Sequence, residues 1–413
     1  MNVEIISIGD EIMIGQIVNT NSAWMATELN RAGFTVQQIV EVHDSATQIV
    51  TALDNALSRA EIVLLTGGLG PTNDDITKKT LCDYFGTQLV YNQQVYDNIA
   101  NIMRYRKRVM NALTDTQALV PENCTIVQNP VGTAPVMWFD HNGKTIVALP
   151  GVPFEMKHAM SNSIIPMLHK KYKFDTILHQ TVVVHGIPES ALAMQIADWE
   201  NALPPFLHLA YLPTFGIVKL RLSGMADNIV DLQTAINQQI EKLKAILGNA
   251  IVAFFDLTAA QIVENFLNTT QSTLAVAESC TGGNIAHQLT EIQGISKYFK
   301  GGIVAYSNEA KENILAVDRN DIIKYGAVSR QVAKQMAIGA RKIFGSNFAI
   351  ATTGIAGPDG GSAHKPVGTV WIAVTNGKKT IVRLHNFGNE RIQNIERATQ
   401  SALLMLLELR TNK

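Results

Sequence analysis

Short apolar runs alternate with amphipathic stretches through the first 170 residues of the chain. An alternation of strand and helix is typical of a parallel sheet that carries helices on both faces. The pattern therefore predicts an α/β fold, with a three-layer doubly wound domain at its start. We expect strands at Val3 to Ile8, Phe34 to Val42, Ile62 to Thr66 and Thr145 to Leu149, and helices at Asn21 to Ala32 and Ala46 to Ser58.

Polar loops follow three of these expected strands. They are Gly9 to Glu11, Gly67 to Asp75 and Pro150 to Glu155. In doubly wound sheets the ligand crevice lies outside the carboxyl ends of the strands. We therefore expect the three loops to converge on one site.

The pattern changes near Lys170 and again near residue 253, which predicts three domains at 1–170, 175–252 and 256–413. The pattern of the middle segment predicts a small α+β module, and it contains no catalytic motif. We interpret Ala253 to Leu257 as a linker to the last domain. In the middle module we expect strands at Thr181 to His185 and Ile217 to Leu222, and helices at Ser190 to Trp199 and Asp227 to Leu247. In the last, α/β domain we expect strands at Thr273 to Glu278, Ile303 to Tyr306, Phe348 to Thr353 and Thr369 to Val374.

Composition narrows the class of protein. The 413 residues are 46% hydrophobic and 17% charged with a net charge of −1, which is typical of a compact soluble protein. This balance favours neither nucleic acid nor an acidic membrane as partner, and no apolar stretch is long enough for a membrane span. The three scattered cysteines, Cys82, Cys124 and Cys280, fit a reducing cytoplasm. Met1 to Gly15 reads as a strand region rather than a signal peptide.

A serine and a lysine stand where strands of the last domain give way to helices. Ser279 ends an apolar strand, and Thr281, Gly282 and Gly283 open the next helix, whose backbone N–H groups suit an oxyanion or a phosphate. Lys311 lies in the first turn of a helix capped by Ser307 or Asn308, where the helix dipole lowers a lysine pKa. Glu309 and Glu312 oppose that effect if they face the amine. The alternatives are a capping serine and a solvated lysine.

Two further features bear on this site. The loop Ala351 to Gly361, with Thr352 and Thr353, is suited to cradle phosphate, although a plain turn has the same composition. Cys280 is a rival nucleophile to Ser279, because thiolates attack more readily. Its nearest histidine in sequence, His287, lies two helical turns away.

The first domain has its own candidate chemistry in Thr66 to Thr77. A glycine-rich turn there precedes the carboxylate pair Asp74 and Asp75, a combination that can hold phosphate through backbone amides and a bridging divalent cation. The alternative is a turn with an aspartate-capped helix. Glu11, with Asn19 and Asn21, stands at the neighbouring strand end and favours a site.

Four ordered motifs of the last domain resemble the CinA C-terminal family of nicotinamide mononucleotide deamidases, also called PncC. They are A-E-S-C-T-G-G, Y-S-N-E-A-K, G-A-V-S and T-G-I-A-G-P-D-G-G followed by K-P-V-G-T-V. The resemblance implies Ser279 as nucleophile, Lys311 as general base and Tyr306 as aligning and relaying group. It adds Thr353 and Arg391 as polar site residues and implies no cofactor for this domain. The residues expected around the substrate are Thr281, Gly282, Gly283, Gly354 and Gly357.

The first domain resembles the molybdopterin-binding fold shared by MogA, MoaB and the CinA N-terminal domain, through Gly9 to Asn21, Thr66 to Thr77 and Leu149 to Met156. In the CinA branch the resemblance implies metal-dependent ADP-ribose pyrophosphatase activity. The implied residues are Glu11, Asp74 and Asp75 for the divalent metal, and Gly67, Gly68, Gly70, Thr72 and Glu155 for the substrate. Two residues depart from the family pattern. Asp10 adds a carboxylate, which is expected to alter metal binding, and Val136 replaces a glycine, which is expected either to narrow the wall or to forbid a positive φ.

Together the two resemblances imply a cytoplasmic, homodimeric hydrolase of pyridine nucleotide salvage. Its substrates would be the small nucleotides nicotinamide mononucleotide and ADP-ribose. A different class remains open, a non-catalytic protein that binds a nucleotide or a pterin. A molybdenum cofactor enzyme is a third interpretation, carried by fold analogy alone.

Overall fold

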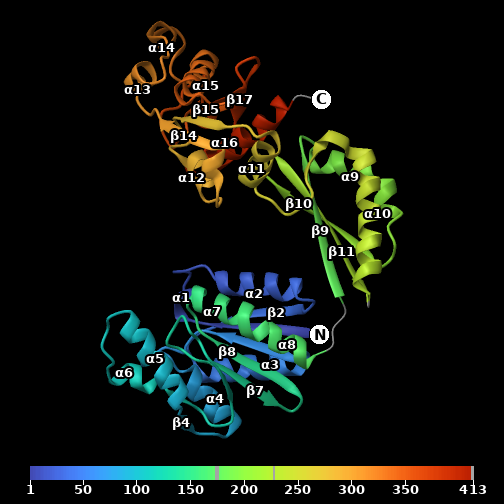
Figure 1. The fold of residues 1–413 in the computed structure, drawn as a ribbon, viewed down its shortest axis with the longest axis vertical. Coiled ribbons are helices and arrows are strands. Elements are labelled where there is room, and N and C mark those ends of the chain that lie inside the picture. Colours follow the sequence, from blue (N-terminus) through green and yellow to red (C-terminus); the bar gives the residue numbers. More distant parts are fainter. Residues whose placement is uncertain (173–175, 227, 411–413) are drawn as a thin grey trace. The chain divides into compact units, whose positions relative to one another are not determined.

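A computed structural model describes residues 1–172, 176–226 and 228–410 (Figure 1). The chain divides into two compact units, Met1–His179 with Gly224–Ala235, and Gln180–Ser223 with Ile236–Lys413. Each unit is described by itself. The expected domain boundary at 175, the expected helix start at Asp227 and the last three residues lie outside the described residues.

The first unit is built on a six-stranded sheet of order β2-β1-β3-β8-β7-β6. Its first four strands are mutually parallel, as expected, whereas β7 pairs in the antiparallel sense with both of its neighbours, β8 and β6. The strands are β1 (Asn2–Ile8), β2 (Thr35–Val42), β3 (Ile62–Thr66), β6 (Thr125–Val127), β7 (Val136–His141) and β8 (Lys144–Leu149).

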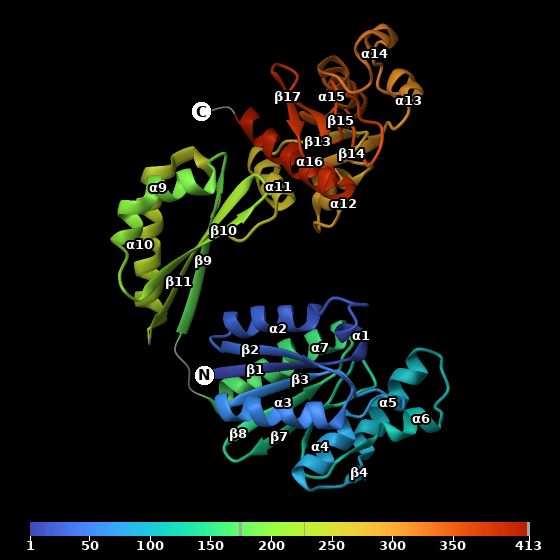
Figure 2. The same ribbon diagram turned by 180° about the vertical axis from the view of Figure 1, so that it is seen from behind.

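Helices cover both faces of this sheet, which confirms the three-layer arrangement (Figures 1 and 2). The alternation of side chains along β3 explains why both faces are buried: Ile62 and Leu64 face one apolar core, and Val63 and Leu65 face the other. One face packs against α2 (Thr20–Arg31), α7 (Pro153–Ala159) and α8 (Ile165–Lys171), and the other against α3 (Ala46–Arg59) and α4 (Thr77–Phe85).

A small insertion follows α4 and has a core of its own, made by Val95, Ile99, Ala118 and Val120. The sequence pattern did not predict it as a separate element. It consists of the hairpin strands β4 (Leu89–Tyr91) and β5 (Leu119–Pro121) with α5 (Gln93–Tyr105) and α6 (Ala112–Thr116) between them. The short helix α1 (Asp10–Met13) follows β1 directly.

The middle module contains a four-stranded sheet of order β10-β11-β9-β12. The two expected strands and both expected helices are present, and the hairpin partner β10 and the short β12 were missed. The elements are β9 (Thr176–His185), β10 (Leu207–Thr214), β11 (Ile217–Ala226), β12 (Ile251–Ala253), α9 (Glu189–Asn201) and α10 (Ile229–Leu247).

The last domain contains a five-stranded sheet of order β14-β13-β15-β16-β17. β13 is parallel to β14 and β15, and β16 and β17 run antiparallel. The strands are β13 (Leu274–Glu278), β14 (Phe299–Val304), β15 (Phe348–Gly354), β16 (Thr369–Thr375) and β17 (Thr380–Asn386). Tyr306 therefore lies beyond the end of β14, not within a strand.

Apolar helices enclose this second sheet as well. Helices α11 (Ala259–Thr270), α12 (Asn284–Thr290) and α16 (Arg391–Leu406) pack on one face. On the other face, alanines of the sheet meet α15 (Arg330–Phe344), with α14 (Arg319–Tyr325) beside it. The short α13 (Asn308–Asn313) follows β14 and carries the lysine of interest. Of the described helices, none is long and apolar enough to cross a membrane.

Candidate active sites

The carboxyl end of β13 and the first turn of α13 bring Ser279 and Lys311 together. Nζ of Lys311 lies 3.1 Å from Oγ of Ser279, and both side chains are buried, with exposed fractions of 1% and 8%. Ser279 follows β13 directly, and its backbone N–H donates to the Thr352 carbonyl of the neighbouring strand β15 at 3.0 Å. The nucleophile is therefore fixed by the sheet, as its position in the sequence predicted.

The Lys311 amine is buried by the way α13 begins. Ser307 is the N-cap, and its Oγ accepts from the Ala310 N–H at 3.1 Å. Nζ also donates to the carbonyls of Ala305 at 2.8 Å and Tyr306 at 3.2 Å. Burial lowers the pKa of Lys311 from 10.5. The direction agrees with the expectation, but its cause is burial rather than the helix dipole.

The acidic residue before the nucleophile occupies the start of the next helix. Glu278 is fully buried, and its carboxylate accepts from the N–H groups of Gly283 (3.0 Å), Ile285 (3.1 Å) and Ala286 (2.9 Å). The N–H groups of Gly283, Ile285 and Ala286 are therefore not free for an oxyanion or phosphate, contrary to the expectation for this helix start. Sequence patterns could have indicated this role, because an acidic side chain near a helix start is stabilised there.

Cys280 is a poor rival to Ser279 in this setting. It is buried, and burial raises the pKa of its thiol to about 12. A thiol with that pKa stays protonated near neutrality. The geometry therefore favours the hydroxyl of Ser279, which has the lysine amine within reach.

A cavity of about 200 Å³ opens over Ser279 and Lys311. Thr353 lies on its wall and donates its hydroxyl to the Ala327 carbonyl at 2.9 Å. Arg391, the first residue of α16, donates to the Gly357 carbonyl at 2.7 Å and to the Tyr306 hydroxyl at 3.2 Å. The cavity is lined by Ser279, Cys280, Tyr306, Asn308, Lys311, Ala327, Val328, Thr353, Gly354, Ala356 and Arg391.

All five residues expected to be catalytic thus line one cavity, whereas the expected substrate-binding residues divide. Gly354 lines it. Thr281 instead bonds Thr352 through its hydroxyl at 2.7 Å, and Gly282 and Gly283 use their N–H groups within the turn and toward Glu278. Gly357 contributes through its carbonyl to Arg391. The sequence patterns did not predict four of the lining residues, Asn308, Ala327, Val328 and Ala356.

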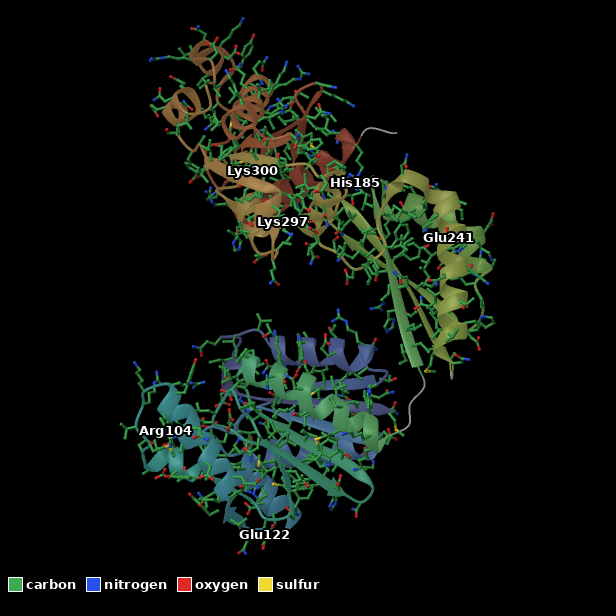
Figure 3. The ribbon with its side chains drawn as sticks, in the orientation of Figure 1. Arg104, Glu122, His185, Glu241, Lys297 and Lys300 are labelled. Carbon is green, nitrogen blue, oxygen red and sulfur yellow. The ribbon has the colours of Figure 1, made fainter. Side chains whose placement is uncertain are left out.

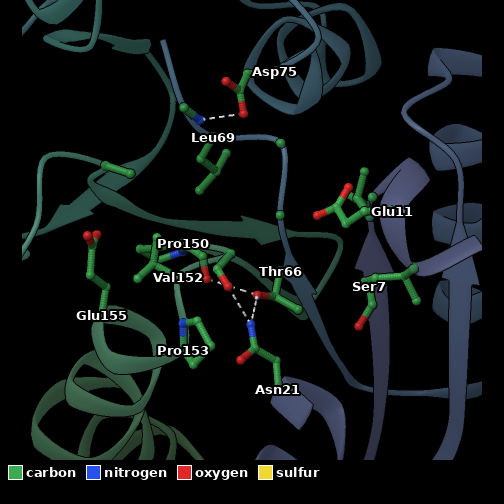
Figure 4. Close-up of a pocket in the computed structure, with 18 of the residues that line it drawn as sticks. Ser7, Glu11, Asn21, Thr66, Leu69, Asp75, Pro150, Val152, Pro153 and Glu155 are labelled. Atoms are coloured by element: carbon green, nitrogen blue, oxygen red, sulfur yellow. Dashed lines mark hydrogen bonds between the residues drawn. The ribbon is translucent and has the colours of Figure 1, made fainter. Parts of the chain in front are cut away.

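The first unit has a larger cavity, of about 480 Å³, at the carboxyl ends of β1, β3 and β8 (Figure 4). This confirms the predicted convergence of three loops. Of the expected residues, Glu11, Gly67, Gly68, Gly70, Asp74, Asp75 and Glu155 line it. Thr72 does not, because its hydroxyl is bound to Asp75. Asp44, after β2, and Gln117, after α6, were missed; only Asp44 follows a parallel strand, so the sheet rule could have found it.

Asp75 holds the glycine-rich loop in its observed shape. Its carboxylate accepts from Gly70 N–H at 2.7 Å, Thr72 N–H at 3.0 Å and Thr72 hydroxyl at 2.5 Å. A Cβ at Gly70 would lie 2.3 Å from Oδ2 of Asp75, so a larger residue there would displace this carboxylate. The prediction of Asp75 as a metal ligand stays open, but part of its hydrogen-bonding capacity already serves the loop.

All the charged side chains that line this cavity are carboxylates. The pKa of Asp44 is raised, first by burial and then by the charges of Asp10, Glu11 and Asp74. Oxygen ligands of this kind fit a hard divalent cation in their chemistry. The described residues nevertheless include no group of three His, Cys, Asp or Glu side chains placed to hold a metal ion. The donors suited to such an ion are therefore present, but they are not gathered into a ready site.

Asp10 and Val136, the two departures from the family pattern, lie in different surroundings. Asp10 turns toward His43, which it meets at 2.8 Å, and toward the N–H of Asp44. Val136 begins β7 and is fully buried in the core between the sheet and α7, and it is not among the residues that line the cavity. Its φ is not in the left-handed region. The expectation that Val136 narrows the cavity wall was therefore wrong.

Glu155 forms part of another wall, and Gly132 lies against its carboxylate. Oε2 of Glu155 accepts from Asn129 at 2.7 Å, and burial raises the pKa of this carboxyl. A Cβ at Gly132 would lie 1.8 Å from the Glu155 carboxylate, so a larger residue there would displace that carboxylate. Glu155 is thus positioned by contacts that the sequence alone did not indicate.

Comparison with known proteins assigns three consecutive segments of the chain to families. Three family models match this chain: the "CinA C-terminal domain" at residues 256–410, the "Probable molybdopterin binding domain" at 4–170 and the "Damage-inducible protein CinA KH domain" at 179–253. The middle module, unassigned from its sequence, therefore matches a KH domain.

Relatives and a solved structure extend this result. A CinA-like protein of Cytophaga hutchinsonii is 46% identical over 98% of this chain and 96% of its own length. One of Flavobacterium psychrophilum is 43% identical over 98% of both. The crystal structure of the competence/damage inducible protein CihA from Agrobacterium tumefaciens is 41% identical and covers 37% of this chain and 94% of its own, with a TM-score of 0.37. The chain belongs to the CinA family.

Proposed function

We propose that this protein deamidates nicotinamide mononucleotide to nicotinate mononucleotide and ammonia in its C-terminal domain. The observation that carries the proposal is the buried pair of Ser279 and Lys311, 3.1 Å apart under a cavity. A hydroxyl next to an amine of lowered pKa is the arrangement of a Ser–Lys hydrolase. Family membership and the motif resemblance supply the choice of substrate.

The reaction follows from these two side chains. The neutral Lys311 amine takes the proton of the Ser279 hydroxyl while Oγ bonds to the carboxamide carbon. The protonated lysine returns that proton to the departing nitrogen, the C–N bond breaks, and ammonia leaves an acyl-enzyme ester. Water, deprotonated by the same amine, attacks the ester; Ser279 regains its proton, and the product is a carboxylate.

Release of ammonia from nicotinamide mononucleotide by the purified full chain tests the proposal. We expect turnover by the native protein and its loss in Ser279→Ala. If the native protein binds the nucleotide but releases no ammonia, the proposal fails in favour of a non-catalytic binding protein. Nicotinamide riboside in parallel reports whether the phosphate contributes to recognition.

A second activity, metal-dependent cleavage of the ADP-ribose pyrophosphate, is favoured in the N-terminal domain by one observation. The described residues that line its cavity include several carboxylates but no lysine, arginine or histidine. An anionic substrate in such a cavity needs a cation, which would neutralise the pyrophosphate and polarise its bonds. Of the predicted ligands, Glu11 and Asp74 line the cavity together with Asp44, and their carboxylates would have to move toward one another to hold that ion.

Cleavage of ADP-ribose with and without added Mg²⁺ or Mn²⁺ tests this activity. We expect cleavage to require the metal and to fall in Glu11→Gln. A protein that cleaves ADP-ribose equally well in the presence of chelator contradicts the metal requirement. If the chain instead binds a pterin and leaves ADP-ribose intact, the third interpretation from the sequence is favoured.

A further inference from the structure

One motif of the C-terminal domain has no role in the chemistry above. It is K-P-V-G-T-V, which begins at Lys365. Nζ of Lys365 donates to the carbonyl of Tyr325 at 2.7 Å and to that of Val328 at 2.8 Å. A lysine on a surface loop normally leaves its ammonium in water. Here two short hydrogen bonds direct it to backbone atoms of a distant segment.

The two carbonyls flank a cavity wall. Tyr325 ends α14, and Val328 lies just before α15, so Lys365 bridges the connection between these two helices. Ala327 and Val328 in that connection line the cavity over Ser279. The carbonyl at the end of α14 is also the negative end of a helix, where a cation is favourable.

Gly326 makes room for this bridge. Its φ is +81°, and a Cβ there would lie 3.2 Å from Nζ of Lys365. The glycine thus both permits the left-handed backbone and keeps the approach to the ammonium open. The G-A-V-S motif and the K-P-V-G-T-V motif therefore act on the same contact.

The loop that carries Lys365 contributes to the opposite wall. Its first residues, Gly354 and Ala356, line the cavity, and the Gly357 carbonyl holds Arg391. Near its end, Lys365 is held in a tight turn by hydrogen bonds with Ser362. The ammonium therefore ties one wall, Ala327 and Val328, to the loop that forms another.

We infer that Lys365 is a positioning residue for the C-terminal site, which fixes the Ala327–Val328 wall at the distance from Ser279 that the substrate requires. The hydroxyl of Thr353, on β15, donates to the carbonyl of Ala327 in the same wall. The Thr353 hydroxyl and the Lys365 ammonium therefore both hold this wall. The inference rests on the proposed deamidase function. Lys365 itself takes no part in bond making, because it does not line the cavity.

The test compares Lys365→Met, Lys365→Arg and a control in the full chain. Lys297→Met is a matched control, since Lys297 is an exposed lysine of the same domain (Figure 3). Hydrogen exchange of peptides spanning Gly326 to Val328 reports the wall without any substrate. For nicotinamide mononucleotide, KM and kcat are measured, and calorimetry in a Ser279→Ala background measures binding.

In Lys365→Met we expect faster exchange in these peptides, a KM roughly tenfold higher and a kcat changed by less than about threefold, because a displaced wall weakens positioning. The pH dependence of kcat stays unchanged, because Lys311 keeps its surroundings. Lys365→Arg restores most of the affinity, since a guanidinium also donates to two carbonyls. The control behaves as the native protein.

Two results overturn the inference: unchanged exchange at Gly326 to Val328, or faster exchange with native KM and binding. A native protein that neither binds nor deamidates the nucleotide is a different outcome. It refutes the proposed function. The hydrogen-exchange comparison then tests only whether Lys365 holds the connection between α14 and α15.

Discussion

Lys311 donates from Nζ to Oγ of Ser279 at 3.1 Å, although the two residues are 32 positions apart in the chain. The contact joins the residue that follows β13 to helix α13, and both side chains are buried. Proton transfer between the two groups therefore needs no intervening water. The following predictions test what this pair and its surroundings do.

Ser279→Ala should reduce ammonia release from nicotinamide mononucleotide by more than about 10³-fold, whereas Cys280→Ala should leave it within a few-fold of native. The reason is that the Cys280 thiol, with a pKa of about 12, is not a nucleophile near neutrality. A coupled ammonia assay measures both variants. Full activity in Ser279→Ala would falsify the serine mechanism.

The rate of deamidation should rise with pH and level off above the lowered pKa of Lys311. Burial favours the neutral amine, and only the neutral form can accept the Ser279 proton. A pH profile of kcat locates this rising limb below the pKa of 10.5 of an ordinary lysine. A flat profile across this range would argue against Lys311 as the base.

The same group makes stability depend on pH. Between the folded pKa of Lys311 and 10.5, the unfolded chain binds more protons than the folded one, so folding is favoured as pH rises and loses stability as pH falls through this window. Below the folded pKa the penalty is complete and constant. Lys311→Met should lack this contribution, which thermal unfolding of both proteins at several pH values will reveal.

Tyr306→Phe should lower kcat by less than about tenfold and act mainly through KM. The Tyr306 hydroxyl bonds Arg391, and its side chain is 61% exposed, while Lys311 meets Tyr306 only at its backbone carbonyl. General acid–base groups contribute about 10² to 10⁴-fold. A fall in kcat of that size in Tyr306→Phe would instead support the relay role that the family resemblance implies.

Glu278→Ala should destabilise the C-terminal domain by about 1–3 kcal/mol or more, because three buried N–H groups lose their acceptor. Glu278→Gln retains one carbonyl oxygen and should cost less. Chemical denaturation measures both variants. Equal stability of Glu278→Ala and native protein would show that the helix start finds other acceptors.

Asp75→Ala should destabilise the N-terminal domain by about 1–3 kcal/mol even without metal or nucleotide, because its carboxylate holds Gly70 and Thr72. Asp74→Ala, at an exposed position of the same loop, should cost less, because only exposed contacts of its carboxylate are lost. Thermal unfolding with chelator present separates the two roles. If Asp75→Ala is as stable as the native protein with chelator and differs from it only when metal is added, Asp75 acts as a ligand rather than as a support for the loop.

The sequence predicted most of the sheet-forming segments because fully buried strands leave an unbroken apolar pattern. Ile62 to Thr66 was predicted with its observed bounds. Strands with exposed positions, such as β10 and β17, were missed, since half of each carries no apolar signal. The middle module was not assigned to a family, and residues 179–253 lack the G-x-x-G sequence by which KH loops are known.

The candidate sites could be predicted as far as they lie at strand ends. Glu11, Ser279 and Lys311 were found because the rules for parallel sheets place such residues at one edge. The buried role of Glu278 and the loop-binding role of Asp75 depend on which donors a carboxylate meets after folding. Those partners are set by tertiary packing, which the local pattern does not contain.

The carboxylate of Glu278 has one further consequence. It adjoins the nucleophile and is anchored to three amides of the following turn, while Ser279 is anchored to β15. Conformational entropy at this corner is therefore lost when the domain folds, before any ligand arrives. The position of the Ser279 hydroxyl is therefore fixed before the substrate binds. On binding, the conformational entropy that is lost is mainly that of the substrate.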